Sequence, residues 1–97
     1  MQKPLIIERK AEREFQQAIN WYDQISGELG DRIEAEIRKA LRSIKEYSEI
    51  GAEARPRIRR VILDTFPYGV FYVNGKKATR ILAFIHHARD PRKWPKY

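Results

Sequence analysis

The chain has 97 residues, a net charge of +7 and no cysteine. This length predicts one domain over residues 1–97, and the lack of cysteine excludes disulfides and thiolate catalysis and fits a reducing cytoplasm. No apolar stretch is long enough to span a membrane, and no secretory signal is apparent.

The first half predicts a short strand followed by two antiparallel helices. Leu5-Ile6-Ile7 is a β-branched run that is typical of a strand. Apolar residues then recur every three or four positions over 11–25 and again over 29–47, which predicts one apolar face on each of two helices. Ser26-Gly27 interrupts this period, and Gly51 is expected to end the second helix. Because each helix has one apolar face, the pair is expected to cover a sheet.

The second half predicts a three-stranded antiparallel meander. Strands are expected over 58–63, 68–73 and 78–86, separated by a turn at 64–67 and a two-residue hairpin at Asn74-Gly75. Apolar residues of the last strand do not alternate with polar ones, so this strand is expected to be central. The predicted fold is α+β, with a short N-terminal strand, an antiparallel helical hairpin and the meander in the order β-α-α-β-β-β.

Alternation along the last strand predicts which side chains share a face. Three aliphatic residues are expected to meet the helices: Ile81, Ala83 and Ile85. Four residues are expected on the opposite, outer face: Arg80, Leu82, Phe84 and His86. An exposed strip of Leu82 and Phe84, with Trp21 off the apolar face of its helix, therefore predicts a docking surface for a partner protein.

The second half also carries the excess of positive charge. Residues 1–51 hold nine Lys/Arg and ten Asp/Glu, whereas residues 52–97 hold eleven and three. Guanidinium groups stay charged and bind phosphate bidentately. Five arginines on or after the predicted strands are candidates for binding an anionic target: Arg59, Arg60, Arg80, Arg89 and Arg92. This charge favours nucleic acid, the ribosome or an acidic protein as partner, with a solvated surface as the alternative.

The segment after the last strand is open to two interpretations. His86 either contacts phosphate and transfers protons, or it hydrogen-bonds to the following turn and fixes the chain end. Asp90, which precedes Pro91, is expected to form a turn or to pair with Arg89. Trp94 is expected to cover the sheet edge, with stacking on a base as the alternative.

Several segments of the chain resemble the RelE/ParE family of toxins in their order and spacing. They are Leu29-Gly30-Asp31-Arg32, Arg59-Arg60-Val61, Phe66-Pro67-Tyr68-x-Val70-Phe71-Tyr72 and His86-x-x-Arg89-Asp90-Pro91-x-x-Trp94. The similarity spans the chain and is greatest to the ParE-like, plasmid-stabilisation branch. It implies the β-α-α-β-β-β fold, and a growth-inhibiting toxin of a type II toxin–antitoxin pair that is neutralised in a hetero-oligomer by a cognate antitoxin. Within this motif Pro67, Tyr68, His86, Asp90, Pro91 and Trp94 are expected to be structural.

The resemblance implies two alternative targets. The ParE-like branch is associated with inhibition of DNA gyrase, and the RelE-like branch with cleavage of mRNA in the ribosomal A site. A nuclease would require cations and an acid–base group, for which this chain offers four residues: Arg59, Arg60, Arg80 and His86. The lysine cluster of the RelE-like branch has no clear counterpart, because Lys76 and Lys77 lie by the predicted hairpin and Tyr97 does not match the family tyrosine.

We therefore expect a toxin that inhibits DNA gyrase by binding, without catalytic residues, metal or cofactor. Cleavage of mRNA on the ribosome is the alternative function. A non-toxic DNA-binding module is a third hypothesis, which predicts tight binding of duplex DNA at low salt.

Overall fold

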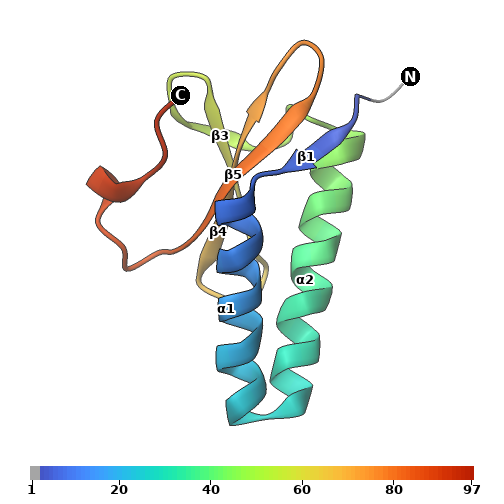
Figure 1. The fold of residues 1–97 in the computed structure, drawn as a ribbon, viewed down its shortest axis with the longest axis vertical. Helices are drawn as coiled ribbons and strands as arrows, with labels where there is room; N and C mark the ends of the chain where they lie inside the picture. Colours follow the sequence, from blue (N-terminus) through green and yellow to red (C-terminus); the bar gives the residue numbers. More distant parts are fainter. Residues whose placement is uncertain (1–2) are drawn as a thin grey trace.

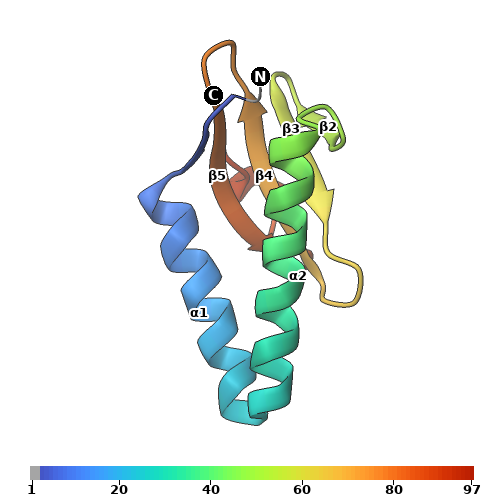
Figure 2. The same cartoon turned by 90° about the vertical axis from the view of Figure 1, so that its right-hand side faces the viewer.

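The computed structural model describes residues 3–97, so the first two positions of the expected domain lie outside the described residues. Its elements follow one another as β1 (Leu5–Ile7), α1 (Arg9–Ile25), α2 (Gly27–Glu46), β2 (Ala52–Arg55), β3 (Ile58–Ile62), β4 (Tyr68–Asn74), β5 (Thr79–His86) and the 3-10 helix η1 (Pro91–Lys93). The two helices cover one face of the sheet, and the C-terminal segment crosses the other (Figures 1 and 2).

The strands form one mixed sheet in the order β1-β5-β4-β3-β2. β1 is parallel to β5, and the remaining neighbours are antiparallel. The predicted α+β class, N-terminal strand and helical hairpin are confirmed, and β3, β4 and β5 form the predicted antiparallel meander. The prediction is incomplete, because β2 adds a fourth strand after the helices. The sequence Ala52-Glu53-Ala54-Arg55 contains no β-branched or aromatic residue, so its composition does not indicate a strand.

Two predicted boundaries are also wrong. α2 ends at Glu46, well before Gly51, and Gly51 serves another purpose: a Cβ there would lie 2.9 Å from the hydroxyl of Tyr72. The predicted hairpin turn at Asn74-Gly75 lies instead at residues 76–77, because Asn74 pairs with Thr79 and no described glycine has a positive φ. The side chain of Lys3 holds this hairpin through Asn74 Oδ1 and the carbonyl oxygen of Gly75.

A bulge at Leu82 decides which face each residue of β5 occupies. Phe71 pairs with Ala83 and Tyr72 pairs with Ile81, so Leu82 has no partner on β4. An inserted residue resets the alternation of a strand. Beyond the bulge the predicted faces are therefore reversed.

The reversal corrects four of the predicted positions. Phe84 faces the helices, together with Ile81, whereas Ala83 and Ile85 belong to the cluster on the outer face. His86, paired with Tyr68, also stands on the helix side of the sheet. Only Ile81, which precedes the bulge, meets the helices as predicted.

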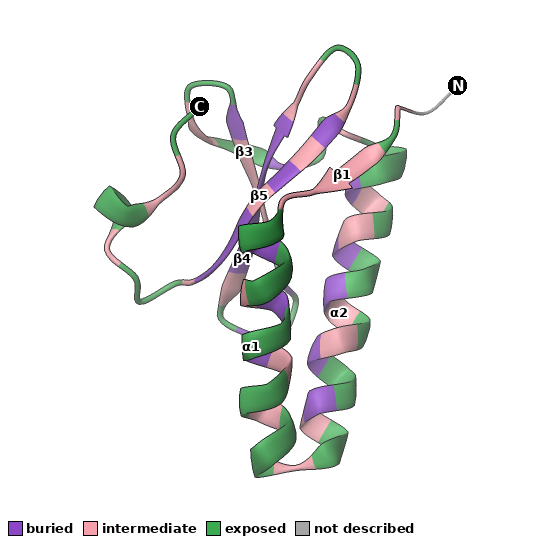
Figure 3. Cartoon of the chain, in the orientation of Figure 1, coloured by how far each residue is buried: buried purple, intermediate pink, exposed green. Residues whose placement is uncertain are grey.

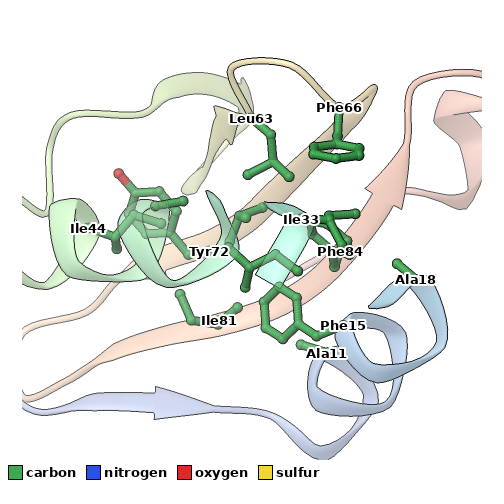
Figure 4. Packing of buried hydrophobic residues seen from close by; sticks show 13 residues of the cluster. Ala11, Phe15, Ala18, Ile33, Ile44, Leu63, Phe66, Tyr72, Ile81 and Phe84 are labelled. Carbon is green, nitrogen blue, oxygen red and sulfur yellow. The ribbon is translucent and has the colours of Figure 1, made fainter. Parts of the chain in front are cut away.

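The main core lies between the helices and the sheet (Figures 3 and 4). The rings of Phe15 on α1 and Phe84 on β5 are 4.8 Å apart, and Tyr22 meets Phe66 edge-on at 4.9 Å. Each fully buried side chain of this size contributes roughly 1.5–3 kcal/mol relative to an exposed one. The apolar periods of both helices are confirmed, since the buried residues of α1 and α2 fall on them: Ala11, Phe15, Ala18, Ile33, Ile37, Ala40 and Ile44.

A second, smaller core lies on the outer face of the sheet. Its buried members are Ile58, Phe71, Val73, Ala83 and Ile85. Trp94, from the C-terminal segment, packs against this cluster. Both faces of β5 are therefore covered, as predicted for a central strand.

Candidate functional site

The C-terminal segment builds an aromatic and cationic layer on the outer face. The ring of Trp94 lies 5.2 Å from that of Phe71, at an interplanar angle of 52°. The guanidinium group of Arg60 lies 5.0 Å from the Trp94 ring centroid and 5.8 Å from that of Phe71. The guanidinium group of Arg55, on β2, lies 5.7 Å from the Trp94 ring centroid. It also donates a hydrogen bond to the carbonyl of Pro91. Trp94 thus covers the outer face of β4, the middle strand, and not the sheet edge where the sequence placed it.

A pocket of about 260 Å³ opens beside this layer. Its lining residues are Arg60, Ile62, Phe71, Ile85, His86, His87 and Trp94. We call it the outer pocket. It combines one guanidinium group with two imidazoles and an aromatic wall, a set that can hold a phosphate group or a flat ring.

His86 fixes the turn that follows β5. Its Nδ1 accepts a hydrogen bond from the Ala88 N–H at 2.9 Å, and its carbonyl accepts one from the Arg89 N–H at 3.0 Å. Its ring meets Tyr68 edge-on at 5.1 Å. With Nδ1 engaged as an acceptor, the neutral imidazole carries its proton on Nε2. This geometry favours the structural interpretation of His86, because protonation of Nδ1 would break the hydrogen bond within the turn.

Asp90 closes the next turn by binding Arg92. The carboxylate accepts hydrogen bonds from the backbone N–H of Arg92 at 2.9 Å and from its Nε and Nη2 at 2.9 and 2.7 Å. The side-chain hydrogen bond from Arg92, followed by the backbone one, lowers the pKa of Asp90 below its ordinary value. The predicted turn is present, but the partner of Asp90 is Arg92 and the predicted pairing with Arg89 is wrong.

Arg59 and Arg60 point to opposite sides of the sheet, as neighbours on a strand must. Arg60 pairs with Phe71 and faces the outer pocket, whereas Arg59 pairs with Tyr72 on the helix side. The Nη1 of Arg59 donates to the carbonyls of Glu49 at 3.0 Å and Gly51 at 2.7 Å. Arg59 therefore holds the loop between α2 and β2.

The remaining arginines are spread over the molecule. Arg80 lies opposite Val73 on the outer face, with its Nη1 3.0 Å from Glu8 Oε2. It stands near the start of β5, about 20 Å along the strand from His86 and on the other face. Arg89 lies on the helix side. The structure thus brings Arg60 together with His86 at one pocket and does not gather the predicted five-arginine set in one place.

A comparison with protein families decides the identity of this fold. Residues 5–91, which contain both α-helices and all five strands, match the family described as "ParE toxin of type II toxin-antitoxin system, parDE". The chain belongs to the ParE toxin family. The resemblance inferred from the sequence motifs is thereby confirmed.

A solved structure shows the same fold for this ParE-family chain. One chain of "Chromosomal ParDE TA system from P. aeruginosa" superimposes with a TM-score of 0.76 at 19% identity, over 87% of this chain and 95% of that chain. A comparison with curated proteins returned no significant match.

The prediction that Leu82 and Phe84 form an exposed apolar strip on this ParE-family chain is wrong. Phe84 is only 3% exposed, Leu82 is half-buried, and the two face opposite sides of the sheet because of the bulge. Trp21, by contrast, is 61% exposed, as its position off the apolar stripe predicts.

Trp21 borders a groove between α1 and the end of β5. The groove has a volume of about 180 Å³ and is lined by Glu14, Gln17, Ala18, Trp21, Tyr68, Phe84, His86 and Arg89. β1 pairs only with residues 79–81 of β5, so the edge of β5 is open beyond them. The carboxylate of Glu14 accepts the Phe84 N–H at 3.0 Å and occupies part of that edge.

Sequence reasoning missed a second exposed apolar surface, between α2 and the open end of β3. β2 reaches only as far as Arg60, so Val61 and Ile62 have no neighbour on that side. Ile50 and Ile62 are 54% and 48% exposed there, beside a groove of about 210 Å³. The available signal was Ile50, an isoleucine in a polar loop next to Gly51.

Two further properties concern metals and membranes. Within residues 3–97 no group of three or more His, Cys, Asp or Glu side chains is arranged to hold a metal ion. In the same range no helix is long and apolar enough to cross a membrane.

Proposed function

We propose that this ParE-family protein is a toxin that inhibits DNA gyrase by binding to it, and that a cognate antitoxin neutralises it. The observation that carries the proposal is the composition of the outer pocket. Arg60 is the only one of the five predicted arginines that lines it. Such a pocket can recognise an anionic or aromatic group, and the ParE-like branch is the one associated with gyrase.

Cleavage of RNA requires more than recognition. A base must take the 2′-proton, an acid must protonate the leaving oxygen, and cations must stabilise the developing charge. Arg59 is turned to the other side of the sheet and bound to two carbonyls, and Arg80 is paired with Glu8. The nuclease set expected from the sequence is therefore dispersed, which supports binding over catalysis.

The surface proposed to contact the target surrounds the turn after β5. Arg60 presents its guanidinium group over two aromatic rings, and Arg89 and Arg92 stand exposed on the turn and on η1. The pairing of Arg92 with Asp90 reduces its net contribution to the local charge. Arg60 and Arg89 are thus the stronger candidates for target contact.

The antitoxin is proposed to occupy the groove at Trp21. A large exposed aromatic side chain beside half-buried rings is typical of a protein-binding hot spot. Arg89, which lines the groove, and the basic second half as a whole complement an acidic antitoxin segment. The solved structure similar to this chain is described as a ParDE toxin–antitoxin system, which supports a hetero-oligomer here.

The alternative function is ribosome-dependent cleavage of mRNA. The observation that favours it is the presence of His86 and His87 beside Arg60 in the outer pocket. One arginine and two imidazoles provide a cation and proton-transfer groups, although the Nδ1 of His86 is occupied by the Ala88 N–H.

Parallel assays of the purified protein separate the two functions. The proposal predicts that the protein blocks supercoiling by gyrase, that the antitoxin restores it, and that mRNA on translating ribosomes stays intact. Cleaved mRNA with unaffected supercoiling would establish the alternative instead.

A further inference from the structure

Two hairpin turns meet at the end of the sheet opposite the outer pocket and carry a cluster of cations. The turn between β2 and β3 contributes Arg57, and the turn between β4 and β5 contributes Lys76 and Lys77. A hollow of about 350 Å³ lies against both turns. It is lined by Arg57, Val73, Gly75, Lys76, Lys77, Ala78, Arg80 and Tyr97. Four of these eight residues have cationic side chains, and none is an aspartate or a glutamate.

Arg57 occupies a position that normally belongs to glycine. Arg55 pairs with Ile58, so Pro56 and Arg57 form a two-residue turn, and Arg57 has a φ of 69°. A proline followed by a residue with positive φ is the pattern of a type II turn, in which the second position favours glycine or asparagine. It is the only non-glycine residue with positive φ in the described part of the chain. An arginine held in a strained conformation is a reason to look for a function of its side chain.

Tyr97 adds an aromatic surface to the same hollow. The guanidinium group of Arg57 lies over its ring at 5.5 Å from the centroid. The residue remains 59% exposed, so it offers solvent a flat surface beside the cations. Cations that alternate with an exposed aromatic ring are typical of sites for single-stranded nucleic acid.

The charges of this cluster are largely unneutralised. The ion pairs among residues 3–97 leave out Arg57, Lys76 and Lys77. Arg80 pairs with Glu8, and its side chain stays 41% exposed. The carboxylate of Glu53 lines a neighbouring hollow, which shares Arg57 and Lys76 with this one. Uncompensated cations at a concave surface attract anions.

We propose that this cluster binds single-stranded nucleic acid. Backbone phosphates lie between Arg57, Lys76, Lys77 and Arg80, and one base stacks on the exposed surface of Tyr97. The hollow and the outer pocket are two separate cavities on the outer face of β4. Val73 lines the first and Phe71 the second, on the same face of the strand and about 7 Å apart. A bound strand can therefore run from the hairpin turns towards Arg60.

Binding of a labelled oligonucleotide to the purified full-length protein tests this site, independently of the assignment of gyrase. The probe is a single strand of about twelve nucleotides, within the range of ~4–16 nucleotides typical of such sites, followed by fluorescence anisotropy. Lys76→Ala/Lys77→Ala is expected to weaken binding on the order of tenfold to thirtyfold at ~0.1 M salt and to reduce the salt slope by about 1.4. Tyr97→Ala is also expected to weaken binding relative to the wild type, but with no change in the salt slope.

Two variants separate the site from general charge and from folding. Arg42→Ala/Lys45→Ala removes the same charge from exposed positions of α2 and is expected to leave only a small, non-specific loss. Arg57→Gly keeps the turn, because glycine accepts a positive φ, and is expected to lose affinity without losing stability.

The proposal would be overturned if the wild-type protein does not bind the single strand at low salt, or if both double variants lose the same amount of affinity. It would also be overturned if the matched duplex binds equally well or more tightly, or if inorganic phosphate at a matched phosphate concentration displaces the oligonucleotide. None of these results would affect the proposed inhibition of gyrase, which the supercoiling assay tests separately.

Discussion

Arg59 and Tyr72 face each other across the pairing of β3 and β4, and both side chains hold the loop between α2 and β2. The Tyr72 hydroxyl donates to the Ser48 carbonyl and accepts the Gly51 N–H, both at 2.9 Å. Arg59 donates to the carbonyls of Glu49 and Gly51. A cation that the sequence alone assigns to target binding therefore has a structural role that is visible only in the fold.

Tyr72→Phe is expected to destabilise the protein. The substitution leaves the buried Gly51 N–H and the Ser48 carbonyl without their partner, which costs about 1–3 kcal/mol of unfolding free energy. Urea denaturation measures the change. Tyr47→Phe is the matched control, because Tyr47 is 64% exposed, and it is expected to have no effect. Equal stability of the two variants would contradict the role of Tyr72.

The same residue predicts a dependence of stability on alkaline pH. Burial raises the pKa of Tyr72 above its ordinary value of 10.0, so the folded chain favours the neutral phenol. This stabilisation is fully present below pH 10 and is lost as the pH rises through the folded pKa. Denaturation between about pH 8 and 11 is expected to show a smaller alkaline loss of stability in Tyr72→Phe than in the wild type. Parallel curves for the two proteins would contradict the expectation.

The bulge in β5 predicts unequal costs for two neighbouring truncations. Phe84→Ala removes a ring buried against Phe15 and is expected to cost about 3–5 kcal/mol. Leu82→Ala affects a half-buried side chain on the outer face and is expected to cost about 1–2 kcal/mol. Thermal or chemical denaturation checks the order, and a larger cost for Leu82→Ala would show that the faces are assigned wrongly.

Arg60→Gln and Arg59→Gln distinguish target contact from loop support. Arg60→Gln removes the guanidinium group from the outer pocket, and the loss of a charge-assisted hydrogen bond is expected to weaken inhibition about tenfold to a hundredfold. Arg59→Gln is expected to lower stability by about 1–3 kcal/mol, with unchanged inhibition per folded molecule. Supercoiling assays on samples of measured folded fraction provide the comparison. The assignment fails if Arg59→Gln is the weaker inhibitor.

Trp21→Ala tests the proposed antitoxin surface. Because Trp21 is exposed, its truncation is expected to leave stability within about 0.5 kcal/mol of the wild type and to weaken antitoxin binding more than about tenfold. Tyr47→Ala removes a similarly exposed aromatic ring from the end of α2 and serves as control for calorimetric titration. If Tyr47→Ala weakens the complex and Trp21→Ala does not, the antitoxin lies elsewhere.

Much of the fold follows from local patterns in the sequence. The apolar periods of α1 and α2, the break at Ser26-Gly27 and the turn before Pro67 are encoded in neighbouring residues. β2 is not, because its four residues have low strand propensity and become a strand only by pairing with β3. The bulge at Leu82 likewise depends on how β4 and β5 pair, and the sequence pattern within β5 does not predict it.

The site shows the same division. The motif from His86 to Trp94 identified the family correctly, but Trp94 covers Phe71 on β4, the middle strand, and not the sheet edge that the sequence suggested. The proximity of individual cations could not be predicted, because a single reversal of alternation moves a side chain to the other face. Arg59 and Arg60 are adjacent in sequence, yet one holds a loop and the other lies over Trp94.

The supercoiling activity of purified DNA gyrase, measured with increasing amounts of this protein, tests the central claim most directly. The account predicts a progressive loss of supercoiling that the cognate antitoxin reverses and that Arg60→Gln weakens. Full supercoiling at protein concentrations that arrest growth or cut mRNA on translating ribosomes would contradict it.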